Sequence, residues 1–148
     1  MPTPLRIAAR VTVPAEPAVT WRTATDWPRQ HEWIWATRVR GGHGTGAQVT
    51  GWTGIGPIGF TDPMVITEWD PPRRCVLQHT GWLVRGSGTF EVLPHGPGSQ
   101  FRWTEHLQLP VPPVIGALAG RVITPIAAWG LRSSLRRFAR LLPPAPQD

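Results

Sequence analysis

The sequence has 148 residues, of which 41% are hydrophobic and 16% charged, values that suit one soluble globular domain able to bury its own core. The formal net charge is +6, and every basic residue is an arginine. Lysine, asparagine and tyrosine, whose codons are AT-rich, are absent, so a GC-rich genome explains part of the arginine excess. A nucleic-acid-binding function is therefore not expected.

The only cysteine, Cys75, excludes an internal disulfide and a metal site built from thiolates. It lies in an apolar run and is expected to be a small core residue. The histidines do not form the close pairs that metal sites usually show, and we expect no metal and no other cofactor. The first six residues lack the basic and apolar regions of a signal peptide, so we expect a cytoplasmic location.

Residues 5–13 alternate between apolar and polar side chains, which predicts the first strand. Pro14 ends this strand, and Pro17 suits the first turn of a helix, where a missing N–H group costs nothing. This helix ends before Pro28, because the residue preceding a proline is disfavoured in the α region. A second short helix is predicted over residues 29–33.

The next segment consists of apolar stretches separated by turns rich in glycine and proline. It predicts six successive strands, at residues 34–39, 47–53, 60–69, 74–81, 83–93 and 99–109. Connections this short favour antiparallel neighbours. The strand over residues 60–69 is apolar on both sides, so either side could face inward.

After Pro110 the apolar residues recur at helical spacing, which predicts a long amphipathic helix that Pro125 kinks or starts. The predicted core-facing stripe consists of Leu118, Val122, Ile126, Trp129, Leu135, Phe138 and Leu142. The helix completes one domain over residues 1–142, and a disordered tail is predicted over residues 143–148. Four arginines on this helix, at positions 132, 136, 137 and 140, are interpreted as a solvated face rather than a phosphate-binding patch.

A membrane span over residues 111–131 is an alternative, because the length suits a bilayer. However, Arg121 lies in its middle and Pro125 interrupts it. An open antiparallel sheet also needs a helix to cover its apolar face. We therefore expect no stable membrane insertion.

The last strand, residues 99–109, contains an anomaly. Its apolar face carries Phe101, Trp103 and Leu107, and Glu105 lies in the middle of that face. A carboxylate removed from water has a raised pKa unless a cation pairs with it, and it can then act as a general acid or base near neutral pH. The alternative is a structural link to an arginine or to the backbone.

Two further residues are candidates for acid–base chemistry. His79 alternates with Cys75 and Leu77, which places it on the apolar face of its strand. Asp62 alternates with Met64 in the same way, if that side of its strand faces inward. A satisfied core histidine remains the structural alternative for His79.

Five short motifs, at residues 13–21, 25–28, 66–74, 86–90 and 101–105, carry a family resemblance. Together with the element order, they resemble the START/Bet v1-like (SRPBCC) superfamily, in particular its polyketide cyclase/dehydrase and lipid-transport branch. The resemblance implies an α+β helix-grip fold, in which a curled antiparallel sheet of about seven strands surrounds a long C-terminal helix. Two short helices follow the first strand, and a hydrophobic cavity lies between the sheet and the long helix.

Nine tryptophans are many for this length, and flat indole rings suit a planar or aromatic ligand, although core filling explains most of them equally well. The residues expected to contact a ligand in the implied cavity are Trp33, Trp52, Met64, Trp82, Phe90, Trp103, Leu118 and Val122.

Members of this superfamily include enzymes, carriers and sensors, so the fold alone does not decide the function. One hypothesis is an enzyme that cyclises or dehydrates a polyketide-like compound, with Glu105 or Asp62 as the base and His79 as the proton carrier. The other is a non-catalytic carrier or sensor of lipids or aromatic metabolites. Both require a hydrophobic small molecule as partner, and a homodimer is an open alternative.

Overall fold

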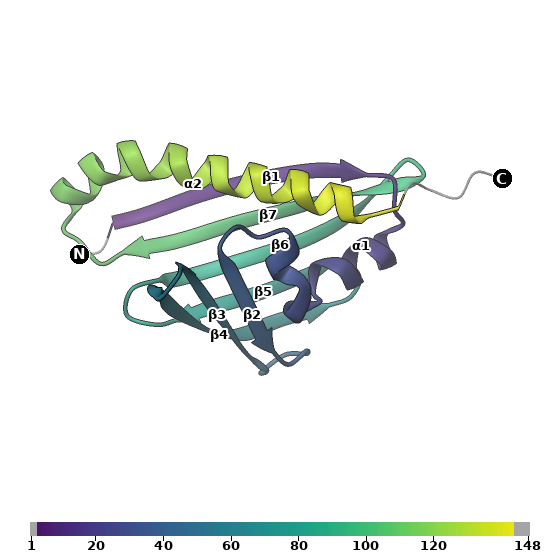
Figure 1. The fold of residues 1–148 in the computed structure, drawn as a ribbon, viewed down its shortest axis with the longest axis horizontal. Helices are drawn as coiled ribbons and strands as arrows, with labels where there is room; N and C mark the ends of the chain where they lie inside the picture. The colour runs from purple at the N-terminus through teal and green to yellow at the C-terminus, as the bar shows by residue number, and fades with distance from the viewer. Residues whose placement is uncertain (1–2, 144–148) are drawn as a thin grey trace.

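The computed structural model describes residues 3–143 and contains one curled, seven-stranded antiparallel sheet (Figure 1). Its elements are β1 (Thr3–Val13), α1 (Pro17–Ala24), the 3₁₀-helix η1 (Trp27–Glu32), β2 (Thr37–Gly41), β3 (Gln48–Ile55), β4 (Ile58–Asp70), β5 (Arg74–Thr80), β6 (Arg85–His95), β7 (Gly98–Leu109) and α2 (Pro113–Leu141). The predicted α+β helix-grip arrangement is confirmed. The predicted tail lies, apart from Pro143, outside the described residues.

The strands follow the order β1-β7-β6-β5-β4-β3-β2 across the sheet. The long helix α2 lies along β1 at one edge, and η1 lies against β2 at the other edge (Figure 1). Helix α1 contacts β6 and β7. The three helices therefore stand on the same side of the curled sheet, and its concave face is enclosed between them.

Strand β4 changes its inward side midway along its length, which answers the question that its sequence leaves open. Asp62 and Met64 line the concave side, and Ile66 is completely buried there. A β-bulge after Ile66 shifts the register. Trp69 therefore also faces inward, where its ring meets Trp21 edge-on at 5.1 Å between centroids. The strand is apolar on both sides because each half has a different inward side.

The centre of the core is a cluster of aromatic rings contributed by β6, β7, α2 and the residue after η1. Trp33 meets Phe138 at 5.0 Å, and Phe101 meets Phe138 at 4.7 Å between ring centroids. Phe90 and Trp103 complete the cluster from the sheet. Such edge-to-face and tilted ring contacts add to the stabilisation from apolar burial. Cys75 is also buried, and this burial, with the nearby charge of Glu68, raises the pKa of its thiol to about 12.

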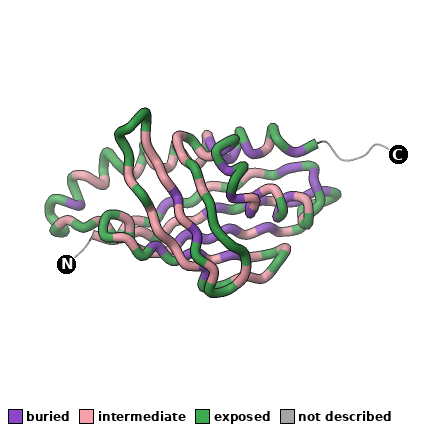
Figure 2. The backbone as a smooth tube through the Cα atoms, turned by 60° about the horizontal axis from the view of Figure 1, so that its bottom comes forward, coloured by how far each residue is buried: buried purple, intermediate pink, exposed green. Residues whose placement is uncertain are grey.

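The predicted core-facing stripe of the long helix is only half right. Its C-terminal part is confirmed, because Leu135, Phe138 and Leu142 are buried. Its N-terminal part is wrong, because its four members there are exposed, namely Leu118, Val122, Ile126 and Trp129. Trp129 and Leu135 are six residues apart, which is about 240° around a helix, so the two halves lie on different faces. Figure 2 shows the change along α2, from mostly green and pink in its first half to purple near its end.

Helix α2 is therefore anchored to the sheet mainly through its C-terminal half. We expect Phe138→Ala to lower the free energy of unfolding by about 3 to 5 kcal/mol, because it removes a completely buried ring. Leu118→Ala, in the exposed half of the same helix, should change it by less than about 0.5 kcal/mol. Urea unfolding of both variants measures the difference, and equal losses would contradict the one-ended anchoring.

Candidate functional site

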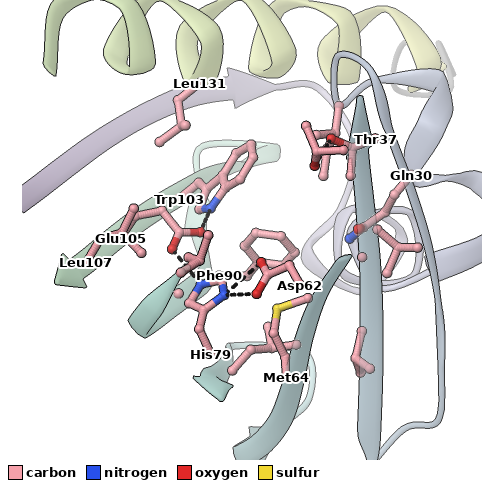
Figure 3. A pocket seen from close by; sticks show the side chains of 18 of the residues that line it. Gln30, Thr37, Asp62, Met64, His79, Phe90, Trp103, Glu105, Leu107 and Leu131 are labelled. Carbon is pink, nitrogen blue, oxygen red and sulfur yellow. Dashed lines mark hydrogen bonds and ion pairs between the residues drawn. The ribbon is translucent and has the colours of Figure 1, made fainter. Parts of the chain in front are cut away.

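A cavity of about 380 Å³ lies between the concave face of the sheet and the helices (Figure 3). This volume falls within the range of small-molecule sites. Most of its lining is apolar and comes from Ile7, Ile34, Val39, Val49, Phe60, Met64, Leu77, Val84, Phe90, Trp103, Leu107, Ala127 and Leu131. The cavity is therefore suited to a hydrophobic ligand, and α2 contributes to its lining only through Ala127 and Leu131.

Three ionisable side chains meet at one wall of this cavity, and we call Asp62, His79 and Glu105 the trio. The Nδ1 atom of His79 lies 2.9 Å from both carboxylate oxygens of Asp62. The Nε2 atom lies 3.1 Å from Oε2 of Glu105. All three side chains are largely buried, with at most 15% of their surface exposed. Figure 3 shows the two carboxylates on opposite sides of the imidazole ring.

The strand register explains how three distant sequence positions meet. His79 on β5 is paired with Met64 on β4, so Asp62 lies two residues further along the same face. Glu105 lies on β7, and β6 separates that strand from β5. The β6 residue opposite Glu105 is Gly88, where an added Cβ atom would stand 2.7 Å from Oε1 of that carboxylate. The missing side chain lets Glu105 reach across β6 to His79.

A fourth residue holds the Glu105 carboxylate. The indole Nε1 of Trp103, two residues earlier on the same face of β7, donates a hydrogen bond of 2.7 Å to Oε1. Glu105 therefore has one oxygen on Trp103 and the other on His79. No arginine is needed to satisfy it, and the expected alternatives of an arginine or a backbone partner are replaced by a histidine and a tryptophan.

The charge state of His79 follows from its neighbours. Burial alone lowers the pKa of a histidine, because the charged form loses its hydration. The hydrogen bonds and charges of Asp62 and Glu105 outweigh this effect and raise the pKa of His79 to about 9. At neutral pH the ring is therefore an imidazolium that donates from both nitrogens. One cation faces two carboxylates, so the formal charge of the trio is −1.

The trio brings together groups that can accept and supply protons beside an apolar space. Carboxylate oxygens retain lone pairs beyond those used by His79, and they can accept a proton from a bound molecule. The adjacent imidazolium favours negative charge that develops on such a molecule. No group of three histidine, cysteine or acidic side chains within residues 3–143 is arranged to hold a metal ion.

The structure brings some of the expected ligand-contacting residues to the cavity and places others elsewhere. Met64, Phe90 and Trp103 line it. Trp33 is buried in the aromatic cluster behind the lining, and Trp52 borders a separate hollow beside His31. Three residues are exposed and do not line the cavity, namely Trp82, Leu118 and Val122. Leu118 and Val122 lie on the outward face of α2, so the prediction that they contact a ligand in the cavity is wrong.

Sequence reasoning missed the lining residues Ala127 and Leu131 of α2, and also Gln30 and Thr37. Ala127 and Leu131 belong to a second stripe of α2, which they share with Leu135 at intervals of four residues. This spacing is visible in the sequence and could have predicted that they face the cavity. Gln30 and Thr37 lie on either side of an irregular turn in which Ala36 has a φ angle of 54°. An alanine in this conformation cannot be predicted from the sequence, so neither could the position of these two side chains.

Comparison with known proteins assigns this chain to a family. A sequence model of the family described as polyketide cyclase / dehydrase and lipid transport matches residues 4–143. The resemblance found in the sequence motifs is thereby confirmed. No curated protein matches the chain.

Solved structures from several bacteria share the fold. A Thermus thermophilus protein has a TM-score of 0.72 and 20% identity, covering 92% of this chain and 95% of its own. A Staphylococcus aureus protein of unknown function has a TM-score of 0.78 and 5% identity, covering 95% and 94%. A Mesorhizobium loti protein has a TM-score of 0.69 and 15% identity, covering 93% and 96%. At these identities the likeness shows the fold alone.

The raised pKa of His79 predicts a loss of stability at high pH. Its unfolded pKa is about 6.5 and its folded value about 9, so the stabilisation is complete below pH 6.5 and disappears as the pH rises through 9. The shift corresponds to roughly 3 kcal/mol. Urea unfolding between pH 6 and pH 10 should show this loss in the wild type and in His106→Gln, which changes an exposed histidine. If His79→Gln showed the same pH dependence, His79 would not be the residue whose titration causes the loss of stability.

The space at Gly88 predicts a second, more local effect. Gly88→Ala should push the Glu105 carboxylate away from His79 and lower the pKa of the imidazole, with little change in the backbone. Gly51→Ala is the matched control, because its Cβ atom would meet Met64 at an ordinary 3.6 Å. NMR titration of the His79 ring nitrogens distinguishes the two variants. An unchanged His79 midpoint in Gly88→Ala would show that the missing side chain is not what admits Glu105.

Proposed function

Because the chain belongs to the polyketide cyclase / dehydrase and lipid transport family, we propose that it binds a hydrophobic small molecule in the cavity and transfers a proton on that molecule through the trio. One observation carries the proposal. A buried imidazolium held between two carboxylates forms a wall of a mostly apolar cavity. Clefts that combine apolar lining with strongly perturbed ionisable groups are the usual form of active sites.

The position of the trio argues for chemistry rather than for stability. Buried ion pairs contribute little net stability compared with well-packed apolar residues, because both charges lose their hydration. Three apolar side chains would close this wall of the sheet at lower electrostatic cost. The polar groups instead line the cavity, where a ligand would meet them. This supports a role toward the ligand.

The proton transfer that the trio supports begins with a carboxylate as base. Glu105 or Asp62 takes a proton from a carbon next to a ligand carbonyl, and the electron pair of the broken C–H bond moves onto the carbonyl oxygen. His79 stabilises this developing negative charge. In a cyclisation the enolate carbon then attacks a second carbonyl of the ligand, whose π electrons move onto its oxygen, and in a dehydration the enolate expels hydroxide. The protonated carboxyl gives its proton to that alkoxide or to the departing hydroxide. The cavity holds the ligand in one conformation for this step.

A second function has an observation in its favour. Both ring nitrogens of His79 and both carboxylate oxygens of Glu105 are already hydrogen-bonded within the site. A polar network satisfied without a ligand also suits a carrier or sensor, in which the trio orients a hydroxyl or carbonyl group without changing it. This alternative predicts binding without turnover.

The two functions are separated by measuring binding and proton abstraction on the same variants. The binding probe is N-phenyl-1-naphthylamine, whose fluorescence rises in an apolar cavity. The chemical probe is 5-nitrobenzisoxazole, a planar compound that opens when a carboxylate removes its C–H proton. We expect Glu105→Gln to bind the first probe as the wild type does and to lose at least about a hundredfold in rate on the second.

Two controls complete this experiment. Ala127→Phe fills the cavity from α2 and should abolish both signals, whereas Ala117→Phe, exposed on the same helix, should abolish neither. Equal rates in the wild type, Glu105→Gln and Asp62→Asn would remove the catalytic role and leave the carrier. Binding that survives Ala127→Phe would remove the cavity as the ligand site.

A further inference from the structure

The outward face of α2 is apolar over its first half, from Val114 to Trp129. Side chains there are exposed to an unusual degree, with 77% of Val114, 65% of Leu118, 62% of Val122 and 57% of Trp129 accessible. The full set, which we call the outward stripe, is Val114, Ile115, Leu118, Val122, Ile126 and Trp129. No element within residues 3–143 covers it. Contiguous exposed apolar surfaces of this kind mark interaction sites.

Two turns of the sheet expose further apolar side chains at the end of the molecule where α2 begins. The β3–β4 turn exposes Ile55 and Ile58, and the β5–β6 turn exposes Trp82 and Leu83. The register places both turns at the sheet end where β1 begins and β7 ends. Helix α2 also begins at that end (Figure 1). Its Gly116 packs directly against Thr3.

Charges are arranged to complement an anionic partner. The last three turns of α2 carry Arg132, Arg136 and Arg140 on the face that continues the outward stripe, with Arg137 beside them. Residues 33–61, 80–90 and 106–143, which supply the whole surface, contain no aspartate or glutamate. The carboxylates of Glu68 and Asp70 on β4 and of Glu91 on β6 lie toward the opposite end of the sheet. There they pair with Arg73 and Arg74.

We propose that the outward stripe and the two apolar turns dock on the surface of a lipid bilayer that contains anionic lipids. The apolar side chains enter the boundary between headgroups and acyl chains, and the arginines of α2 contact the headgroup phosphates. Trp35 and Trp129 border a shallow hollow with Arg136 and Arg140, which places aromatic and cationic groups together at the headgroup level.

A second copy of the chain fits this surface less well. Helix α2 carries five arginines and no acidic residue. Two such helices facing each other would bring their arginines together without a carboxylate on either helix. A bilayer rich in anionic headgroups supplies the missing charge.

A membrane-spanning position also fits less well than docking. By length and composition α2 could cross a bilayer, a criterion that core helices also meet. However, Leu135 and Phe138 fix its C-terminal half to the sheet. Docking leaves that anchoring intact, whereas spanning would require it to break.

Flotation with phosphatidylcholine vesicles, with and without phosphatidylglycerol, tests the proposal on the full chain. We expect binding only to the anionic vesicles, and loss of that binding in the double variant Leu118→Glu and Val122→Glu. The matched control, Gln48→Glu with Gln78→Glu, adds the same charge to exposed positions of the sheet and should bind as the wild type does. Arg136→Gln with Arg140→Gln should weaken binding about thirtyfold, and Arg10→Gln with Arg22→Gln far less.

Light scattering at the same protein concentrations identifies the competing occupant. The proposal would be overturned in favour of a second copy by two results together. The wild type would form a dimer that dissociates in the Leu118→Glu, Val122→Glu double variant, and the wild type would not bind to anionic vesicles. Equal flotation of the double variant and its control would overturn it as well. None of the substituted residues lines the cavity, so binding of N-phenyl-1-naphthylamine should persist in every variant. The proposed function and the docking surface can therefore fail independently.

Discussion

The burial of one cation between two carboxylates constrains much of this molecule. His79, Asp62 and Glu105 come from three strands, and none of them can be left alone in an apolar interior. Removing one partner of such a group typically costs about 3 to 5 kcal/mol, because an unpaired charge stays buried. The registers of β4, β5 and β7 are therefore tied to one another through side chains as well as through backbone hydrogen bonds. The glycine at position 88 belongs to the same constraint, since Glu105 reaches His79 only across it.

The two halves of helix α2 have different roles in the structure. The C-terminal half completes the aromatic cluster around Trp33 and so joins the helix to the sheet. The N-terminal half rests along β1 and leaves an apolar face to solvent. A helix that served only to cover the sheet would need one apolar face. This helix has two, and the second accounts for much of the exposed apolar surface of the protein.

The fold could be read from the sequence because its signals are local. Alternation predicted the strands and placed Glu105 among Phe101 and Trp103, while proline and glycine marked the turns. The contacts within the site could not be read in the same way. Whether Asp62 meets His79 depends on a cross-strand register and on a bulge after Ile66, and neither leaves a clear mark in one sequence.

The long helix shows a different limit of sequence reasoning. Its apolar residues form two stripes, and joining Trp129 to Leu135 merged them into one. Periodicity identifies an apolar face but not which of two faces meets the sheet. The prediction that Trp82 lines the cavity is wrong for a related reason. The sequence around an indole side chain is as compatible with an exposed turn as with a cavity wall.

The charge of the trio also bears on which molecules the cavity can admit. With one imidazolium and two carboxylates, its wall is formally negative in surroundings where water does little to screen it. A free fatty acid would place a third carboxylate near Asp62 and Glu105, and repulsion would oppose its entry. Neutral ketones, phenols and esters escape this repulsion, and amines would be attracted. Selection by ligand charge would thus operate in the cavity before any fit of shape.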